Sequence, residues 1–401
     1  MSKGPDKTHR IAVIGPHRRG AISRMAHQPE RGFVITDLCG HSGEGLERYS
    51  ERCGGPPHFT RDYREITENP EIEVVFVCSP DYLHREHACA ALEAGKTVFL
   101  EKPMAIRIED CDSILKAAET PGARLYVGHN MRFFPVMRKM RELIEEGAVG
   151  EVEAVWCRHF VGRGGDYYFK NYNSEREYST SLLLQKGAHD IDMIHWFGGA
   201  FTRRVTGMGK LSVFNRVTDR RGPDLYADRA KPQPEGYPPM NQRGLNPVID
   251  VEDHNMLLLQ LENGVQACYL ECFYTPDYHR NYTVIGTEGR MENYGDHSSR
   301  EHEASVHLWN RHCTYEETGH EVFPVPVVDG THGGADPLMI EDFLTFIETG
   351  VRCGAEPVAA RMAAVVGCCG AESLRDGSRP VDIPGVAAAR SSIQEDSGAF
   401  R

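Results

Sequence analysis

The sequence predicts an α/β protein with two domains: a doubly wound parallel sheet, then an α+β domain with an open, mostly antiparallel sheet. In the first 130 residues, short apolar runs alternate with helix-like segments and glycine-containing loops, which is typical of a parallel sheet. After Gly150 the apolar runs follow one another directly, as strands do in antiparallel sheets. A chain of 401 residues is also long for one core. We expect domains at 1–130 and 131–385 and a polar tail at 386–401.

Composition indicates an ordinary globular protein that is acidic overall. Hydrophobic residues make up 40% and charged residues 26% of the chain, and the net charge of −13 argues against nucleic acid or an anionic membrane as a partner. The N-terminus lacks the apolar core of a signal peptide, and no segment approaches the roughly 18 apolar residues of a membrane span. We therefore expect a cytoplasmic protein. Its twelve cysteines are scattered without a Cys-x-x-Cys pair, which favours free thiols over disulfides or a zinc site.

The first expected strand, at 10–14, leads into a loop with the spacing of a dinucleotide-binding turn. Gly15 and Gly20 match the first and third glycines of Gly-x-Gly-x-x-Gly, where backbone amides and a helix N-terminus hold a pyrophosphate. His17 replaces the middle glycine, and its side chain limits how closely the backbone can approach the phosphates. Three basic side chains of this loop either add positive charge for the phosphates or are simply solvated: His17, Arg18 and Arg19.

A second strand is expected at 33–39. NAD-binding domains carry an acidic residue near the end of this strand, which bonds the adenosine ribose. Here Gly40, His41 and Ser42 follow the strand, and Asp37 lies earlier within it. The usual determinant for NAD is missing, so the sequence leaves NAD and NADP open.

A later strand, expected at 97–100, ends in Glu101, Lys102 and Pro103. Proline cannot donate a hydrogen bond to a sheet ladder, so the strand stops there. In open parallel sheets, ligands bind in the crevice outside the carboxyl ends of the strands, which would place the lysine for chemistry. On their own, these three residues fit a surface Glu–Lys pair at a turn equally well.

Four motifs in order resemble the Gfo/Idh/MocA family, the glucose–fructose oxidoreductase- and inositol dehydrogenase-like enzymes. They are Ser79-Pro-Asp-Tyr-Leu-His84, Ala91-Leu-Glu-Ala-Gly-Lys96, Glu101-Lys-Pro103 and Gly128-His-Asn-Met-Arg-Phe133. The resemblance extends through 147–150 and 336–346, so it covers nearly the whole chain. It implies a Rossmann domain that binds NAD, with NADP as the open alternative. The expected cofactor contacts are Gly15, His17, Arg18, Arg19, His41, Ser79, His84, Glu101, Lys102 and Pro103.

In the second domain, strands are expected at 151–159, 256–261, 265–274 and 282–285. Two of them flank Glu262-Asn263-Gly264, a strong hairpin signal. One face of such an open sheet is a candidate dimer interface. The resemblance implies the same, because family members associate through this sheet, and we expect a homodimer or homotetramer.

A second candidate catalytic stretch lies at 182–196, where Gly187 precedes a predicted helix. His189 falls in the first turn, and Asp192 follows on the same face, so the carboxylate can orient the imidazole for acid–base chemistry. Alternatively, His189 caps the helix and Asp192 favours its N-terminal dipole. The resemblance matches His189 to the histidine that accompanies the motif lysine, and it implies Lys102 and His189 as the catalytic pair.

The family often carries an aspartate four residues before this histidine; here that position is Gln185, followed by Lys186. A neutral amide cannot act as a base, so proton transfer would rest on Lys102 and His189. Lys186 adds a positive charge near the site, which favours an anionic group on the substrate, such as a carboxylate, sulfonate or phosphate. Alternatively, Lys186 pairs with a local acid or tunes the proton relay.

Two loops are expected to complete the pocket. Residues 158–169 combine glycines, basic residues and aromatic residues, and they either close over a sugar or form an ordinary surface loop. Residues 216–247 hold six prolines without periodicity, which is typical of a lid, an arm or a disordered segment. Clusters at 278–281 and 332–336 are further candidates. The expected substrate contacts are Lys186, Gln185, Asp192, Arg163, Tyr168 and Asn130.

The leading hypothesis is an oxidoreductase that transfers a hydride between a ring carbinol of a neutral or anionic sugar or polyol and a nicotinamide cofactor, while Lys102 and His189 take the hydroxyl proton. A second hypothesis is an NAD-dependent glycoside hydrolase that works by transient oxidation, elimination, hydration and re-reduction, for example on sulfoquinovosides. A third is a cofactor-binding regulator without turnover, which His17 and Gln185 favour. No metal site is expected, because neither a His-Glu-x-x-His motif nor a Cys/His cluster is present.

Overall fold

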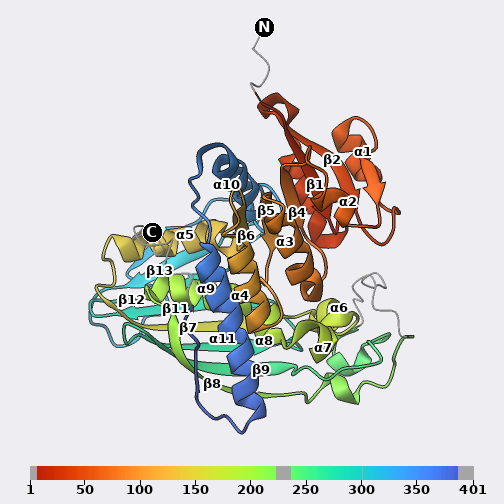
Figure 1. Ribbon diagram of the computed structural model, residues 1–401. Helices are drawn as coiled ribbons and strands as arrows, with labels where there is room; N and C mark the ends of the chain where they lie inside the picture. Colours follow the sequence, from red (N-terminus) through yellow and green to blue (C-terminus); the bar gives the residue numbers. More distant parts are fainter. Residues whose placement is uncertain (1–6, 223–235, 300, 387–401) are drawn as a thin grey trace.

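Alternating strands and helices at the start of the chain build a six-stranded parallel sheet, and the rest of the chain builds a nine-stranded mixed sheet (Figure 1). The structure is a computed structural model that describes residues 7–222, 236–299 and 301–386. Both expected sheet types are present, and the second is mostly antiparallel. Within the described ranges, no helix is both long and apolar enough to cross a membrane.

The parallel sheet has the strand order β3-β2-β1-β4-β5-β6, and every neighbouring pair is parallel. Its strands are β1 (His9–Ile14), β2 (Phe33–Cys39), β3 (His58–Thr60), β4 (Val74–Val77), β5 (Thr97–Glu101) and β6 (Arg124–Gly128). The chain winds outward in both directions from β1 and β4, which makes the crevice beyond their carboxyl ends the expected ligand site. A 3₁₀ helix, η1 (Arg18–Ala26), follows β1 directly.

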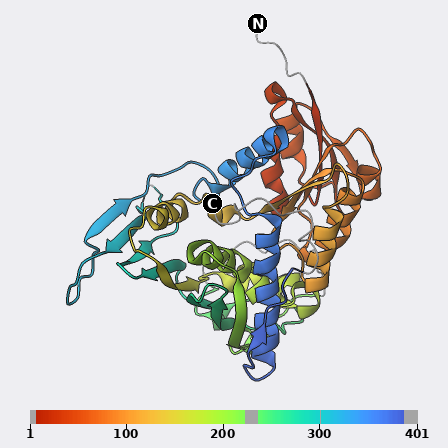
Figure 2. The ribbon, with the colours of Figure 1, turned by 60° about the vertical axis from the view of Figure 1, so that its left-hand side comes forward.

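Helices cover both faces of this sheet because its central strands are apolar on both sides. The helices of this half are α1 (Glu47–Cys53), α2 (Arg64–Thr67), α3 (His84–Glu93) and α4 (Ile108–Ala117). The next helix, α5 (Pro135–Glu145), packs against the second sheet instead. Val75 and Val98 share a core with α3 and α4. Phe76 and Phe99 point the other way and contact Phe343 of α10 (Ala335–Thr349). A helix from the end of the chain therefore completes the first sheet, and Figure 2 shows it beside the red and orange segments.

The second sheet has the order β14-β13-β12-β11-β7-β10-β9-β8-β15; β7 and β10 are parallel and the other pairs antiparallel. Its strands are β7 (Val152–Phe160), β8 (Thr202–Lys210), β9 (His254–Leu261), β10 (Gln266–Cys272), β11 (His279–Gly286), β12 (Arg290–Tyr294), β13 (Ser305–Trp309), β14 (Glu321–Pro324) and β15 (Val381–Asp382). The predicted hairpin at Glu262-Asn263-Gly264 joins β9 to β10 and is confirmed.

Helices α9 (Gly187–Gly198) and α11 (Pro357–Arg375) lie on one face of this sheet. The alternation along β9 shows which face is covered, because Leu257 and Leu259 are buried while Met256 and Leu258 are exposed. Three short helices precede α9: α6 (Gly164–Tyr168), α7 (Arg176–Ser179) and α8 (Leu182–Gln185). The second sheet therefore keeps an exposed apolar face.

Candidate active site

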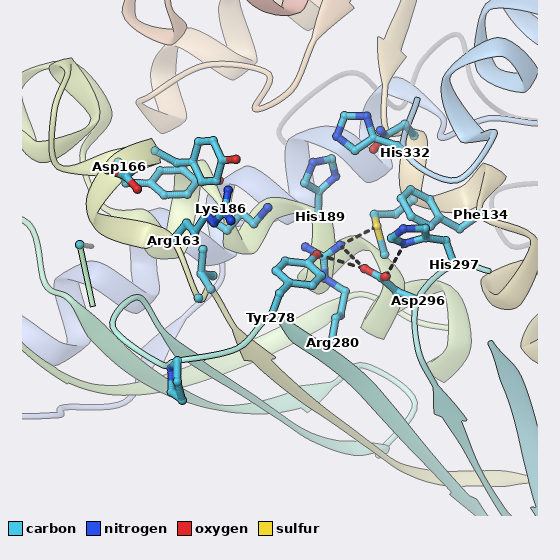
Figure 3. Close-up of a pocket in the computed structure, with 18 of the residues that line it drawn as sticks. Phe134, Arg163, Asp166, Lys186, His189, Tyr278, Arg280, Asp296, His297 and His332 are labelled. Atoms are coloured by element: carbon cyan, nitrogen blue, oxygen red, sulfur yellow. Dashed lines mark hydrogen bonds and ion pairs between the residues drawn. The ribbon is translucent and has the colours of Figure 1, made fainter. Parts of the chain in front are cut away.

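A cavity of about 630 Å³ collects side chains from both halves of the chain (Figure 3). This volume is in the range of small-molecule sites. Five residues that the sequence assigned to the active site line it: Asn130, Arg163, Tyr168, Lys186 and His189. Other polar residues, which the sequence did not assign individually, also line it, among them Asp166, Tyr167, Gln242, Tyr278, Arg280, Asp296, His297 and His332.

Lys102 follows β5 directly, where the chain leaves the carboxyl end of the parallel sheet. Its Nζ donates a hydrogen bond of 2.8 Å to the backbone carbonyl oxygen of Gln185, the last residue of α8. Burial lowers the pKa of Lys102, the positive charge of Lys186 adds to this shift, and the negative charge of Asp81 opposes it. The lysine is therefore anchored near the cavity and loses its proton more readily than an exposed lysine.

The loop that carries Lys102 is tied to the loop after β4 by His84. The two ring nitrogens of His84 lie 2.8 Å from the Pro103 carbonyl oxygen and 3.0 Å from the Ser79 carbonyl oxygen. The Ser79 hydroxyl in turn lies 2.9 Å from Nδ1 of His87. Three residues expected at the cofactor site, Ser79, His84 and Pro103, thus form the frame of the lysine loop.

His189 lies in the first turn of α9, as predicted, and lines the cavity. Burial, together with the positive charges of Lys102 and Lys186, holds the pKa of His189 well below its usual value, so the ring is neutral near pH 7. Its Nδ1 has no hydrogen-bond partner among the described residues. A neutral imidazole here can accept a proton from a bound hydroxyl group.

Asp192 points to Arg132 rather than to His189, which corrects the expectation drawn from helical spacing. Its buried carboxylate accepts hydrogen bonds of 2.9 and 2.8 Å from Nε and Nη2 of Arg132. Nδ1 of His129 lies 3.5 Å from the same carboxylate. A guanidinium offers two parallel donors and a full charge, so it is the stronger partner. Asp192 does not line the cavity; it joins α9 to η4 (Asn130–Phe133).

Lys186 precedes α9 and lies against Tyr168, with its Nζ 5.9 Å from the ring centre. Burial and the positive charge of Arg280 lower the pKa of Lys186 to about 7, although nearby carboxylates oppose the shift. Arg163 is exposed in the turn between β7 and α6. Two cationic side chains therefore face the cavity from neighbouring segments.

Arg280 belongs to a buried charge network behind the cavity. Its Nε lies 3.0 Å from the carboxylate of Asp190, which also bonds Nδ1 of His159 at 2.9 Å and the hydroxyl of Tyr282. Its Nη1 lies 3.8 Å from the carboxylate of Asp296, as the dashed lines in Figure 3 indicate. Since each charge has an opposite charge beside it, removing any one of them would leave an uncompensated buried charge next to the cavity.

Asp336, at the start of α10, connects the glycine loop with the cavity wall. Its buried carboxylate accepts two hydrogen bonds of 2.7 Å from Arg19 and one of 3.0 Å from Asn130. His332, on the cavity wall, lies 2.7 Å away. Although burial opposes ionisation, hydrogen bonds from His332 and Arg19 hold the pKa of Asp336 below its usual range. Arg19 also donates to Glu101 at 2.6 Å, so two carboxylates neutralise a side chain expected at the phosphates.

The loop after β1 has the tight geometry that a dinucleotide site needs. A Cβ atom at Gly15, where φ is +84°, would lie 2.5 Å from the Ser79 amide nitrogen, and one at Gly20 would lie 2.0 Å from the Gly15 carbonyl oxygen. The His17 ring turns toward the end of β2: Nε2 lies 2.9 Å from the Ser42 carbonyl oxygen, and the ring centre lies 5.5 Å from that of His41. The residues of this loop therefore fit the phosphates of a nicotinamide dinucleotide. The imidazoles of His17 and His41 lie near the end of β2, where NAD-binding domains usually carry an acidic residue.

Sequence reasoning named five of the residues that line the cavity, did not single out Asp81, and reached Asp336 only as part of the 332–336 cluster. Asp81 is buried near Lys102, and burial raises its pKa. Its position within Ser79–His84 is the signal that could have identified it. Asp336 lies in the 332–336 cluster, but its partner Arg19 is 317 residues away. Arg18 lies at the start of η1 with a φ of +47°. The 216–247 loop lies partly outside the described residues, because 223–235 are not described.

The chain matches two family profiles in succession. Residues 9–129 match an oxidoreductase family with an NAD-binding Rossmann fold, and residues 137–292 match the GFO/IDH/MocA C-terminal domain. An uncharacterized oxidoreductase from Synechocystis sp. is 32% identical over 75% of this chain and 72% of its own length. Levoglucosan dehydrogenase from Pseudarthrobacter phenanthrenivorans is 25% identical over 85% and 89%. A 2,7-anhydro-N-acetylneuraminate hydratase from Mediterraneibacter gnavus is 28% identical over 51% and 53%.

A solved structure shares the fold over almost the whole chain. Levoglucosan dehydrogenase in complex with NADH and L-sorbose superposes with a TM-score of 0.75, at 20% identity, over 95% of this chain and 100% of that one. The agreement covers both sheets.

Proposed function

This chain belongs to the Gfo/Idh/MocA family of NAD-binding oxidoreductases, and we propose that it oxidises a carbinol of a sugar or polyol to the carbonyl, with Lys102 and His189 receiving the hydroxyl proton. One observation carries the proposal: Lys102, at the end of a strand of the first sheet, is anchored beside α9 of the second half, close enough for its charge to act on His189, which lines the cavity. The charge of Lys102 lowers the pKa of His189, and the lysine is anchored on Gln185, four residues before the histidine. The similarity to levoglucosan dehydrogenase supports a sugar as substrate.

The surroundings of both proposed proton acceptors lower their pKa values and so favour their neutral forms. A bound nicotinamide dinucleotide supplies the oxidant for the carbinol carbon. His189 is neutral and can accept the hydroxyl proton directly. Lys102 has a lowered pKa, so its neutral amine is within reach as a base, and its bond to the Gln185 carbonyl oxygen fixes its direction. The group that has taken the proton then releases it to solvent.

Replacing Lys102 by methionine tests the proposal, because methionine keeps the length of the side chain without its amine. We expect Lys102→Met to lower turnover by at least about 100-fold, the usual size of a lost acid–base group. NADH affinity should change by less than about three-fold, since the glycine loop is untouched. Turnover is followed at 340 nm with a panel of neutral and anionic sugars and polyols. Lys116→Met on the exposed side of α4 is the matched control. Unchanged turnover in Lys102→Met would contradict the assignment.

A redox-neutral reaction is the second candidate, because Gln185 replaces a carboxylate and one relative is named as a hydratase. In this version the carbinol is oxidised to a carbonyl, which acidifies the C–H on the neighbouring carbon. Loss of that proton expels the leaving group from the next carbon along and leaves a double bond, water adds to the double bond, and the carbonyl is reduced again. The hydride returns to the substrate, so atoms and electrons balance without an external oxidant. Sulfoquinovosides are one substrate class to test.

Cofactor retention separates the candidates. Mass spectrometry of ligand released from gently purified, then denatured protein identifies NAD or NADP. Tightly held cofactor and glycoside cleavage without net change at 340 nm would support the redox-neutral reaction. Stoichiometric formation of reduced cofactor would support the dehydrogenase. Cofactor binding without turnover of any sugar would instead support a regulator.

A further inference from the structure

Lys186 and Arg163 are two cations of the cavity without a carboxylate partner. Both line it, and among the described residues no acidic oxygen lies within ion-pair distance, 4.0 Å, of either side chain. The recorded contact of Lys186 is with the ring of Tyr168, which is attractive but does not neutralise charge. Figure 3 draws Lys186 and Arg163 on the same side of His189.

The acids that line the cavity are already engaged with other cations. Asp166 accepts a hydrogen bond of 2.7 Å from Lys170, and both are buried. Asp296 bonds Nδ1 of His297 at 2.7 Å and the hydroxyl of Tyr278 at 3.0 Å. These carboxylates are held in place by their own partners, so they are not placed to neutralise the two free-standing cations.

The excess of positive charge stands out in a chain whose overall net charge is −13. Lys102 lies close to Lys186, and the positive charge that each carries when protonated lowers the pKa of His189. Uncompensated cations in a partly buried cavity are costly unless a ligand brings the opposite charge. The cavity is therefore complementary to an anion, and its volume of about 630 Å³ leaves room for a sugar ring beside the anionic group.

We propose that Lys186 and Arg163 form a subsite for a carboxylate, so that the substrate is a sugar acid rather than a neutral sugar. A guanidinium presents two parallel donors that match a carboxylate, and an ammonium adds a point charge. This inference rests on the proposed function, because it names the substrate class of the same cavity. The carboxylate binds and stays unchanged, while oxidation takes place at a carbinol elsewhere on the sugar.

Paired sugars test the subsite in the NADH-loaded protein. The probes are D-glucuronate with D-glucose, D-galacturonate with D-galactose, and D-gluconate with D-sorbitol, each titrated by calorimetry. The variants are Lys186→Gln and Arg163→Gln, and Lys116→Gln is the control that removes a charge outside the cavity. Because Arg163 is exposed, its variant folds even where Lys186→Gln loses stability.

We expect at least one acid to bind about ten-fold or more tightly than its neutral partner, the effect of one charge-assisted hydrogen bond. Each cavity variant should lower the affinity for the acid far more than the affinity for its neutral partner, and so remove most of this preference; the control should keep it. Equal affinity within every pair, or a preference that survives both variants, would overturn the subsite. Tighter binding of glucose 6-phosphate or sulfoquinovose than of any uronate would overturn the assignment to a carboxylate.

The same measurements distinguish failure of the subsite from failure of the proposed function. Oxidation of neutral sugars that depends on Lys102 but shows no acid preference would overturn the subsite and leave the oxidation standing. Acid-selective binding that needs Lys186 and Arg163, without oxidation that depends on Lys102, would leave the subsite standing and overturn the oxidation.

Discussion

Replacing Asp336 by asparagine tests whether this carboxylate holds the glycine loop and the cavity wall together. The side chain is completely buried and accepts hydrogen bonds from Arg19, Asn130, Thr331 and His332. Removing one charge from a buried ion pair costs about 3–5 kcal/mol. We expect the lower end, about 3 kcal/mol, because Arg19 keeps Glu101 at 2.6 Å and is itself 28% exposed.

The measurements are urea unfolding and titration with NADH. The matched control is Asp342→Asn on the same helix, whose carboxylate accepts a hydrogen bond of 2.8 Å from Tyr126 of β6. Both variants should be less stable than the wild type. Asp336→Asn should also weaken NADH binding, by about ten-fold or about 1.4 kcal/mol, because Arg19 and the loop from Gly15 to Gly20 lose their anchor. Equal NADH affinity in the two variants, or a stability loss under about 1 kcal/mol in Asp336→Asn, would refute this reasoning.

Two further predictions concern the charge of Lys186 and the exposed sheet face. Because the pKa of Lys186 is about 7 and a bound anion would raise it, the affinity for a sugar acid should fall as pH rises from 7 to 9; the charged groups that act on it include Arg280, Asp190, Asp296 and Glu271. Lys186→Arg, whose guanidinium stays charged, should bind with little pH dependence in calorimetry, and parallel declines in both proteins would contradict the role of Lys186. The exposed face of the second sheet carries Leu258, 65% exposed, with Met256 on the same strand, Met208 on the adjacent β8 and Trp156 on β7, two strands away. If copies of the chain associate through it, Leu258→Glu should lower the mass measured by light scattering, while Val351→Glu, at an equally exposed apolar site away from this face, should not; an unchanged mass would argue against this interface.

Features that depend only on residues close together in the sequence could be predicted from it. The end of β5 just before Pro103, the helix that begins at Gly187 and the hairpin at Gly264 depend on local backbone rules, and the structure confirms all three. Each signal needs no knowledge of what lies across the fold.

Features that depend on distant partners could not be predicted in this way. Helical spacing correctly placed Asp192 one turn after His189, but it could not reveal that Arg132 would lie beside it with two donors. In the same way, Arg19 has the charge and the loop position expected of a phosphate-binding side chain, but its partner Asp336 comes from the other end of the chain. Charge pairing across the fold decided the role of both residues.

Gln185 shows how a departure from a motif can keep a geometry and change its charge. The bond that anchors Lys102 goes to the backbone carbonyl oxygen at this position, so it does not depend on the side chain. Replacing the family's aspartate by an amide therefore leaves the lysine in place and removes a negative charge beside it. Fewer negative charges favour the neutral amine, which is the direction of the pKa shift that burial and Lys186 already give Lys102. Asp81, in the same domain as Lys102, supplies a nearby carboxylate. Burial raises the pKa of Asp81, however, so that its negative charge stabilises the protonated lysine less. In the role that we propose for Lys102, the substitution thus favours the neutral amine that a base needs, more than an ionised aspartate at this position would.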